Sequence, residues 1–148
     1  MEVLIVNGPN LNTLGTREPD IYGQVTFSEI EDSLLAEAAR LGVNLTFFQS
    51  NSEGELIDKL QEAGVGGTQG IIINAGALTH YSYSLADAVK ALKIPVVEVH
   101  ISNIFAREEF RHTSVIAPFV AGVIAGFGPA VYSLALQALV GDIGQDIV

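Results

Sequence analysis

The feature that most constrains the fold of this chain is a repeated alternation between short β-branched runs and longer segments of helical character. The runs lack a polar face and are rich in β-branched and aromatic residues; they lie at Val3–Val6, Leu45–Phe48, Ile71–Ile73, Val96–Val99 and Phe119–Ile124. Strands that are apolar on both faces and alternate with helices are typical of a parallel sheet covered on both sides. The pattern therefore predicts an α/β fold.

Helix signals fill the intervals between these runs. Thr26–Glu29 and Ser52–Glu55 both have capping-box spacing, in which a Ser or Thr oxygen and a Glu carboxylate satisfy free backbone N–H groups. The expected helices cover Phe27–Arg40, Glu53–Ala63, Ser84–Leu92 and Ala130–Val140, with a short helical turn at Ala106–Phe110. With right-handed crossovers, this order predicts a flavodoxin-like three-layer sandwich with a five-stranded parallel sheet. A chain of 148 residues suits one domain, 1–148.

The segment Thr113–Gly141 contains no formal charge and has to be tested as a membrane span. Gly126–Pro129 divides it into two pieces, each of a length suited to a core strand or helix. We therefore expect a strand, a turn and a helix, and no membrane insertion. The mean hydropathy of +0.39 is high for so acidic a chain, which favours burial between subunits of a homo-oligomer.

Charge and cysteine content exclude several classes of function. Seventeen acidic against seven basic residues give a net charge of −10, which argues against nucleic-acid partners and anionic membranes. Without cysteine there is no thiolate nucleophile and no sulfur-ligated zinc, and the N-terminal run is too short for a signal peptide. Cytoplasmic residence is expected. Four cations belong to predicted helices or their ends, which leaves Arg17, Arg107 and Arg111.

Polar residues follow four of the predicted strands. In parallel α/β sheets, ligands bind beyond the carboxyl ends of the strands. The polar exits are Asn7–Asn12, Gln49–Asn51, Asn74–Gly76 and His100–Asn103. We therefore expect the ligand-binding site at this edge of the sheet.

Candidate acid–base groups lie at or near this edge. The segment Gly8–Gln24 is long for a βα loop and carries Arg17 and Tyr22, which indicates a lid. Tyrosine can act as a base if its pKa, about 10 in water, is lowered, and a guanidinium about 4 Å away would contribute roughly 4 kcal/mol. Glu98 and His100 point to the same side of an extended strand, where the carboxylate could orient the imidazole. A solvated loop and a histidine bound to a carbonyl are the structural alternatives.

Other chemistries fit less well. His80, His100 and Glu98 could share a metal ion, but the surrounding amides and hydroxyls suit a polyhydroxylated substrate better, and we expect no metal and no cofactor. The lysines lie in or beside helices, which argues against a Schiff base. A hydrolase using Ser102 with His100, or a small-anion binding module, remains open.

Six motifs in order resemble the type II 3-dehydroquinate dehydratase family over nearly the whole chain. They fall within Asn7–Asn12, Leu14–Gly23, Gln49–Gly54, Asn74–His80, Glu98–Asn103 and Ala106–His112. The resemblance implies a cofactor-free anti elimination of water from 3-dehydroquinate through an enolate, in the shikimate pathway or, by the same reaction, in quinate breakdown.

The resemblance also implies roles for individual residues at the reacting atoms. Tyr22 would abstract the proton at C2, and Arg17 would keep its phenol acidic. His100, paired with Glu98, would protonate the departing hydroxyl. Asn10 would help to hold the water that stabilises the enolate.

The implied substrate-binding residues come from three segments. Asn74 and the backbone of Ile101 and Ser102 would bind the carboxylate, while His80 and Arg111 would hold ring hydroxyls.

The family assembles as trimers into a dodecamer, which implies that Asp87 would reach a neighbouring subunit's site, and Arg107 would support the lid. Leu78, Tyr83 and Thr113 are departures from the pattern.

Overall fold

The described residues of the computed structural model, 1–16, 18, 20 and 24–141, form a five-stranded sheet in which every strand pair is parallel. The spatial order is β2-β1-β3-β4-β5. The strands are β1 (Glu2–Asn7), β2 (Asn44–Gln49), β3 (Gly70–Asn74), β4 (Val96–His100) and β5 (Gly122–Ala125). The predicted flavodoxin-like α/β fold is confirmed.

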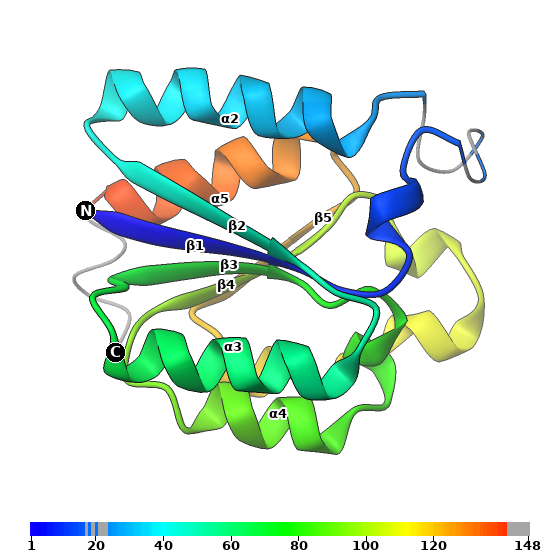
Figure 1. The fold of residues 1–148 in the computed structure, drawn as a ribbon. Coiled ribbons are helices and arrows are strands. Elements are labelled where there is room, and N and C mark those ends of the chain that lie inside the picture. The colour runs from blue at the N-terminus through cyan, green and yellow to red at the C-terminus, as the bar shows by residue number, and fades with distance from the viewer. Residues whose placement is uncertain (17, 19, 21–23, 142–148) are drawn as a thin grey trace.

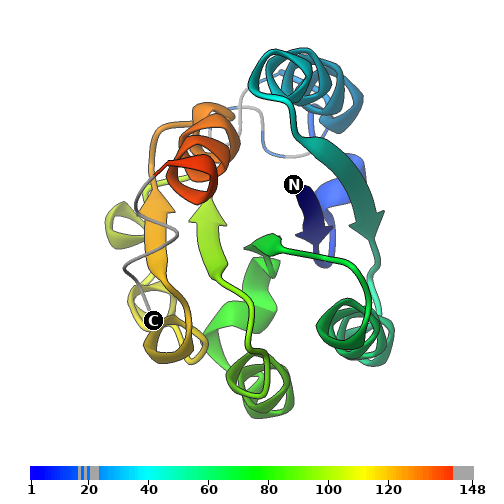
Figure 2. The same ribbon diagram turned by 90° about the vertical axis from the view of Figure 1, so that its left-hand side faces the viewer.

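Helices cover both faces of the sheet (Figure 1). On one face lie α2 (Phe27–Leu41) and α5 (Ala130–Val140), and on the other lie α3 (Glu53–Val65) and α4 (Tyr83–Lys90). Viewed from the side, the two helix pairs flank the twisted sheet as separate layers (Figure 2). Short 3-10 turns gather beyond the carboxyl ends of the strands: η1 (Leu11–Thr13), η2 (Gly76–His80), η3 (Ile104–Ala106), η4 (Glu109–His112) and η5 (Ala117–Phe119).

The core consists of two apolar clusters separated by the sheet. Successive side chains of a strand point to opposite faces, so Val3 and Ile5 of β1 pack with α2 and α5, while Leu4 and Val6 pack with α3 and α4. Both faces of β1 are thus buried, which explains why its sequence shows no polar alternation.

The helix starts follow the predicted capping signals, with one correction. At α2 the capping box is complete: Thr26 Oγ1 accepts from Glu29 N–H, and the Glu29 carboxylate accepts from Thr26 N–H at 2.7 Å. At α3 Ser52 accepts from Glu55 N–H, but the Glu55 carboxylate accepts a hydrogen bond from the Ser50 hydroxyl instead. The second box is therefore only half formed, because Ser50 engages both groups: its hydroxyl donates to Glu55 and accepts from Ser52 N–H.

The apolar stretch from residue 113 onward contains a strand and a helix, as predicted, but the strand begins later than expected. Pro118 lies in the 3-10 turn η5, where its fixed φ and missing N–H suit a turn and not a ladder, so β5 starts at Gly122. The expected helical turn at Ala106–Phe110 is instead split between η3 and η4. Within the described residues, no helix is long and apolar enough to cross a membrane.

Gly8 allows the exits of β1 and β3 to touch. Its N–H donates to Asn74 O at 2.8 Å, and a Cβ built at this position would lie 2.5 Å from Ala75 O. Real Cβ atoms do not approach a carbonyl oxygen so closely, so only glycine permits this contact.

We predict that Gly8→Ala lowers the free energy of unfolding by about 1–3 kcal/mol, because the backbone of Ala75 must move. Gly67→Ala is the matched control, since a Cβ there meets no atom within 4 Å. Urea denaturation of both variants checks the prediction. Equal stabilities would show that the β1 and β3 exits do not constrain one another.

Candidate active site

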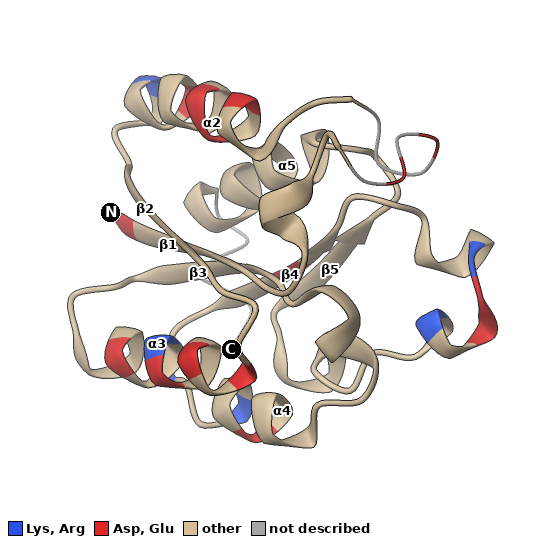
Figure 3. Ribbon diagram, turned by 45° about the vertical axis from the view of Figure 1, so that its right-hand side comes forward, with Lys and Arg blue, Asp and Glu red and all other residues tan. Residues whose placement is uncertain are grey.

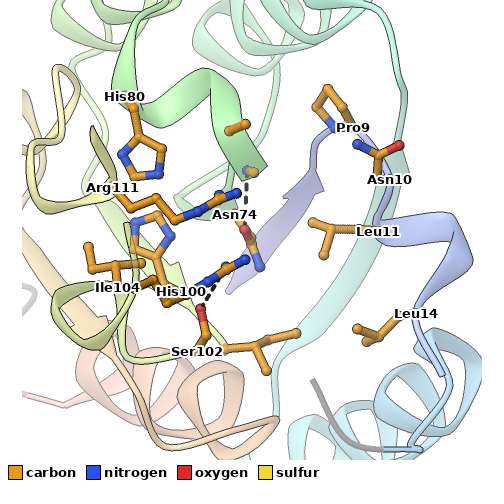
Figure 4. Close-up of a pocket in the computed structure, with 14 residues that line it drawn as sticks. Pro9, Asn10, Leu11, Leu14, Asn74, His80, His100, Ser102, Ile104 and Arg111 are labelled. Carbon is orange, nitrogen blue, oxygen red and sulfur yellow. Dashed lines mark hydrogen bonds between the residues drawn. The ribbon is translucent and has the colours of Figure 1, made fainter. Parts of the chain in front are cut away.

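A pocket lies beyond the carboxyl ends of β1, β3 and β4, where the sequence predicted it (Figure 4). The segment after β1 contributes Pro9, Asn10, Leu11 and Leu14, and the ends of β3 and β4 with the segments after them contribute the remaining walls. The lining residues predicted from the sequence are Asn10, Asn74, His80, His100, Ile101, Ser102, Arg107 and Arg111.

His100 lines the pocket and is paired with the buried carboxylate of Glu98, which is not itself among the lining residues. His100 Nε2 lies 2.6 Å from Glu98 Oε1, and the Glu98 side chain has no solvent exposure. The predicted same-side geometry of these residues is therefore confirmed. An ionised carboxylate only accepts hydrogen bonds, so Nε2 carries the proton and Nδ1 is the ring nitrogen left for other partners.

His80 lies over His100 with its ring nearly parallel to it. The ring centroids are 6.2 Å apart and the planes differ by 19°. His80 Nδ1 lies 2.8 Å from Thr113 O, which fixes Nδ1 as the donor and leaves Nε2 as an acceptor in the neutral ring. Burial, helped by His100 and Arg111 and opposed by the Thr113 carbonyl, lowers the pKa of His80 below its ordinary value. His80 is therefore neutral near pH 7.

Among the described residues, two arginines line the pocket, Arg107 and Arg111. Arg107 Nη1 donates to Ser102 Oγ at 3.2 Å, and its guanidinium lies 4.0 Å from the Glu18 carboxylate. Arg111 Nε donates to Glu108 Oε2 at 2.6 Å. Figure 3 shows acidic residues along the outer helices α2 and α3, while basic residues also occur in the segment after β4.

A buried polar network lies beneath the pocket. The Tyr132 hydroxyl of α5 donates to Asn7 Oδ1 and accepts from Asn74 Nδ2 at 3.1 Å, and all three side chains are buried. Asn74 Oδ1 in turn accepts from Gly76 N–H. Burial raises the pKa of Tyr132, so its phenol stays protonated and remains a donor. The network fixes the amide of Asn74 at the pocket floor.

Asn10 lies at the mouth of the pocket in an unusual backbone conformation. Its φ of 71° is left-handed, a region that asparagine tolerates better than most residues. Its N–H donates to Asn51 Oδ1 at 2.9 Å, which ties the exit of β1 to the exit of β2.

Four of the predicted site residues are not among the described residues that line the pocket, and one of them, Glu98, instead contacts the lining residue His100. Arg17 and Tyr22 lie outside the described residues. Asp87 is exposed on α4, apart from the pocket lining of its own chain.

The alternative chemistries gain no support from this geometry. Among the described residues, no three His, Asp or Glu side chains are grouped so that they could hold a metal ion. For the alternative of a hydrolase that uses Ser102 with His100, the Ser102 hydroxyl accepts a hydrogen bond from Arg107. His100 Nε2 is hydrogen-bonded to Glu98.

Fold and pocket together define a flavodoxin-like α/β enzyme with a buried acid–base pair at its strand ends. A family model described as dehydroquinase class II matches residues 1–140. The 3-dehydroquinate dehydratase of Caldicellulosiruptor bescii is 56% identical over 138 residues, covering 93% of this chain and 95% of that protein. That of Bacillus subtilis is 53% identical over 143 residues, covering 97% and 96%. The chain belongs to the class II dehydroquinase family.

Solved structures agree with this assignment. The crystal structure of type II dehydroquinase from Butyrivibrio crossotus superposes with a TM-score of 0.94 at 45% identity, covering 95% of this chain and 98% of that chain. The enzyme from Propionibacterium acnes gives a TM-score of 0.91 at 43% identity, covering 94% and 95%.

Sequence reasoning missed Tyr132 and Ser114, both of which support pocket residues through long-range contacts. A lone tyrosine in an otherwise apolar helix is a weak signal for a buried hydroxyl that needs partners. Ser114 gives no comparable signal.

We predict that Tyr132→Phe lowers the free energy of unfolding by about 1–3 kcal/mol, because the buried amides of Asn7 and Asn74 lose a partner. Tyr83→Phe, at a residue that is 74% exposed, is the control. Urea denaturation compares the two. A Tyr132→Phe protein as stable as the control would contradict the structural role of this hydroxyl.

Proposed function

We propose that this chain carries out the reaction of its family, the dehydration of 3-dehydroquinate to 3-dehydroshikimate, by acid–base chemistry in one catalytic domain. The observation that carries this proposal is that His100, which lines a polar pocket, is hydrogen-bonded to the buried carboxylate of Glu98. The reaction belongs to the shikimate pathway, and quinate breakdown uses it as well.

His100 is the general acid of the proposal. In the protonated ring Nε2–H remains bonded to Glu98, so Nδ1–H is the proton that passes to the departing C1 hydroxyl. The negative charge of Glu98 stabilises the imidazolium and holds the ring in one orientation. The C1–O bond then breaks and water leaves.

Tyr22 is the proposed base, and Arg17 keeps its phenol acidic. The phenolate takes the proton from C2, and the electron pair moves towards the C3 carbonyl to give an enolate. Loss of the C1 hydroxyl converts the enolate to the conjugated enone. A water held by Asn10 would stabilise the enolate oxygen. These assignments rest on the family resemblance, since both residues lie outside the described residues.

The remaining pocket residues are proposed to bind the substrate. Asn74, with its amide fixed by Tyr132, and the backbone of Ile101 and Ser102 would hold the carboxylate. Neutral His80 can accept a hydrogen bond from a ring hydroxyl at Nε2, while Arg111 donates to another.

Arg107 would link the proposed lid to the pocket wall. It contacts Ser102 at the pocket wall and lies near Glu18 of the long segment after β1. No metal or organic cofactor takes part in the proposed reaction.

We predict that Tyr22→Phe in metal-stripped protein lowers kcat by about 1,000-fold or more, because the base is lost. The enone absorbance of the product measures turnover, and Tyr83→Phe is the control. Wild-type protein treated with EDTA should keep its activity, and borohydride with substrate should not inactivate it.

Two outcomes would overturn this scheme. Undiminished turnover by Tyr22→Phe would remove the base assignment. Activity that EDTA abolishes and zinc restores would favour a metal-dependent reaction.

We further propose that the chain assembles as trimers into a dodecamer, in which Asp87 reaches a neighbouring site. The edge strand β5 and the adjoining segments expose large apolar side chains, among them Phe105 (66%), Val123 (46%) and Phe127 (68%). Apolar patches of this kind are typical of subunit interfaces. Asp87 is exposed and lies apart from its own pocket, as a residue acting in trans would.

We predict a molar mass in solution about twelve times that of the 15.7 kDa chain, measured by light scattering. Asp87→Ala should lower turnover, while Asp58→Ala, an exposed control on α3, should not. Mixed oligomers of Asp87→Ala and Tyr22→Phe subunits should regain activity, because some sites then combine an intact Tyr22 with an intact Asp87. Mixtures no more active than their components would exclude a role in trans.

A further inference from the structure

The second carboxylate oxygen of Glu98 is held by a residue that none of the sequence motifs marks. Ser114 Oγ donates to Glu98 Oε2 at 3.0 Å, while Oε1 is bonded to His100. Glu98 is fully buried, and a buried carboxylate depends on hydrogen bonds to replace its lost hydration. The carboxylate is therefore fixed from two sides.

The direction of the Ser114 hydrogen bond is set by the backbone. The same Oγ accepts from Ala117 N–H at 3.0 Å, at the start of the turn η5. A hydroxyl has one proton, and with a lone pair engaged by Ala117 that proton points at Glu98. Ser114 thus presents a fixed donor to the carboxylate.

We propose that Ser114 is a positioning residue for the reaction, acting through Glu98 to hold the His100 imidazole where it can deliver its proton. The chain of contacts runs from Ala117 N–H through the Ser114 hydroxyl and the Glu98 carboxylate to His100 Nε2. Without the hydroxyl, Glu98 keeps its bond to His100 but loses the contact that fixes its rotation. The inference rests on the role of His100 proposed above.

The segment that carries Ser114 also meets the second histidine. Thr113 O accepts from His80 Nδ1 at 2.8 Å, and Val115 N–H donates to Thr79 O at 2.8 Å. The two stacked imidazoles are thus oriented from one stretch of five residues, 113–117. The contact to His80 uses the backbone carbonyl of residue 113. The departure from the family pattern at Thr113 changes the side chain and leaves this contact in place.

Ser114 and Glu98 also line a second hollow, which lies beside β5 and includes Phe105 and Phe127 in its walls. Truncation of Ser114 opens space next to Glu98 Oε2. Water entering there would compete with His100 for the carboxylate.

The test is a series of substitutions at Ser114 with kcat and KM measured separately. Ser114→Ala should lower kcat by about tenfold to a hundredfold, the size expected when a reacting group is misplaced by a fraction of an ångström to 1 Å, with KM changed by less than about threefold. Ser114→Thr keeps the hydroxyl and should regain most of the lost kcat. Ser114→Cys keeps the shape with a weaker donor and should fall between Thr and Ala.

Ser82→Ala is the matched control. The Ser82 hydroxyl is buried and accepts from Leu85 N–H at 3.0 Å at the start of α4, so this variant loses an equivalent cap. It should keep kcat within about twofold of wild type, although its stability falls by about 1 kcal/mol, a roughly fivefold change in the folding equilibrium. Wild-type kcat in Ser114→Ala, or a loss no larger than that in Ser82→Ala, would overturn the inference.

Two further results keep the outcome decisive. If Ser114→Ala does not fold, wild-type kcat in Ser114→Cys overturns the inference, and an intermediate kcat supports it. The variant His100→Asn separates this inference from the proposed function. If His100→Asn remains active, the assignment of His100 as the acid fails. If His100→Asn is inactive and Ser114→Ala is fully active, only the role of Ser114 is removed.

Discussion

Glu98 is a carboxylate with no solvent exposure, and much of the site is arranged to compensate for its lost hydration. Its two oxygens are bonded to His100 and Ser114, which come from the same strand and from the segment before η5. Loss of either hydrogen bond would leave one oxygen of the buried carboxylate without a substitute for its lost hydration, which is energetically costly. The hydrogen bonds that compensate the buried carboxylate also orient the His100 imidazole. The same contacts therefore stabilise both the folded protein and the arrangement of the proposed acid.

The other polar groups of the site follow a similar rule. Asn74 is fixed by Tyr132, Asn10 is tied to Asn51, and Ser102 is bonded to Arg107. Each of these three pocket residues is thus restrained by the side chain of a second residue. Restraint of this kind lowers the entropy that substrate binding would otherwise have to remove, and it places donors before the reaction begins.

Much of this architecture could be predicted from the sequence, because its causes are local. The apolar runs predicted the strands, and Thr26 predicted the start of α2. The two-residue spacing of Glu98 and His100 in a strand predicted that their side chains lie on the same side. Two differences have local causes that the patterns did not resolve: Ser50 engages the Glu55 carboxylate at the second capping box, and a proline turn precedes β5. The roles of Ser114 and Tyr132 instead depend on partners 16 and 125 residues away, and no local pattern encodes such pairings.

The position of Tyr132 in the last helix has a consequence for the order in which the protein matures. Its hydroxyl joins α5 to the ends of β1 and β3, both of which are synthesised before it. A nascent chain that has already produced His80, Glu98 and His100 still lacks the donor that completes the floor of the pocket. The pocket floor is therefore complete only when the C-terminal helix α5 has been synthesised and has packed against the sheet. A chain that ends before Tyr132 contains Glu98 and His100 but lacks the hydroxyl that holds Asn74.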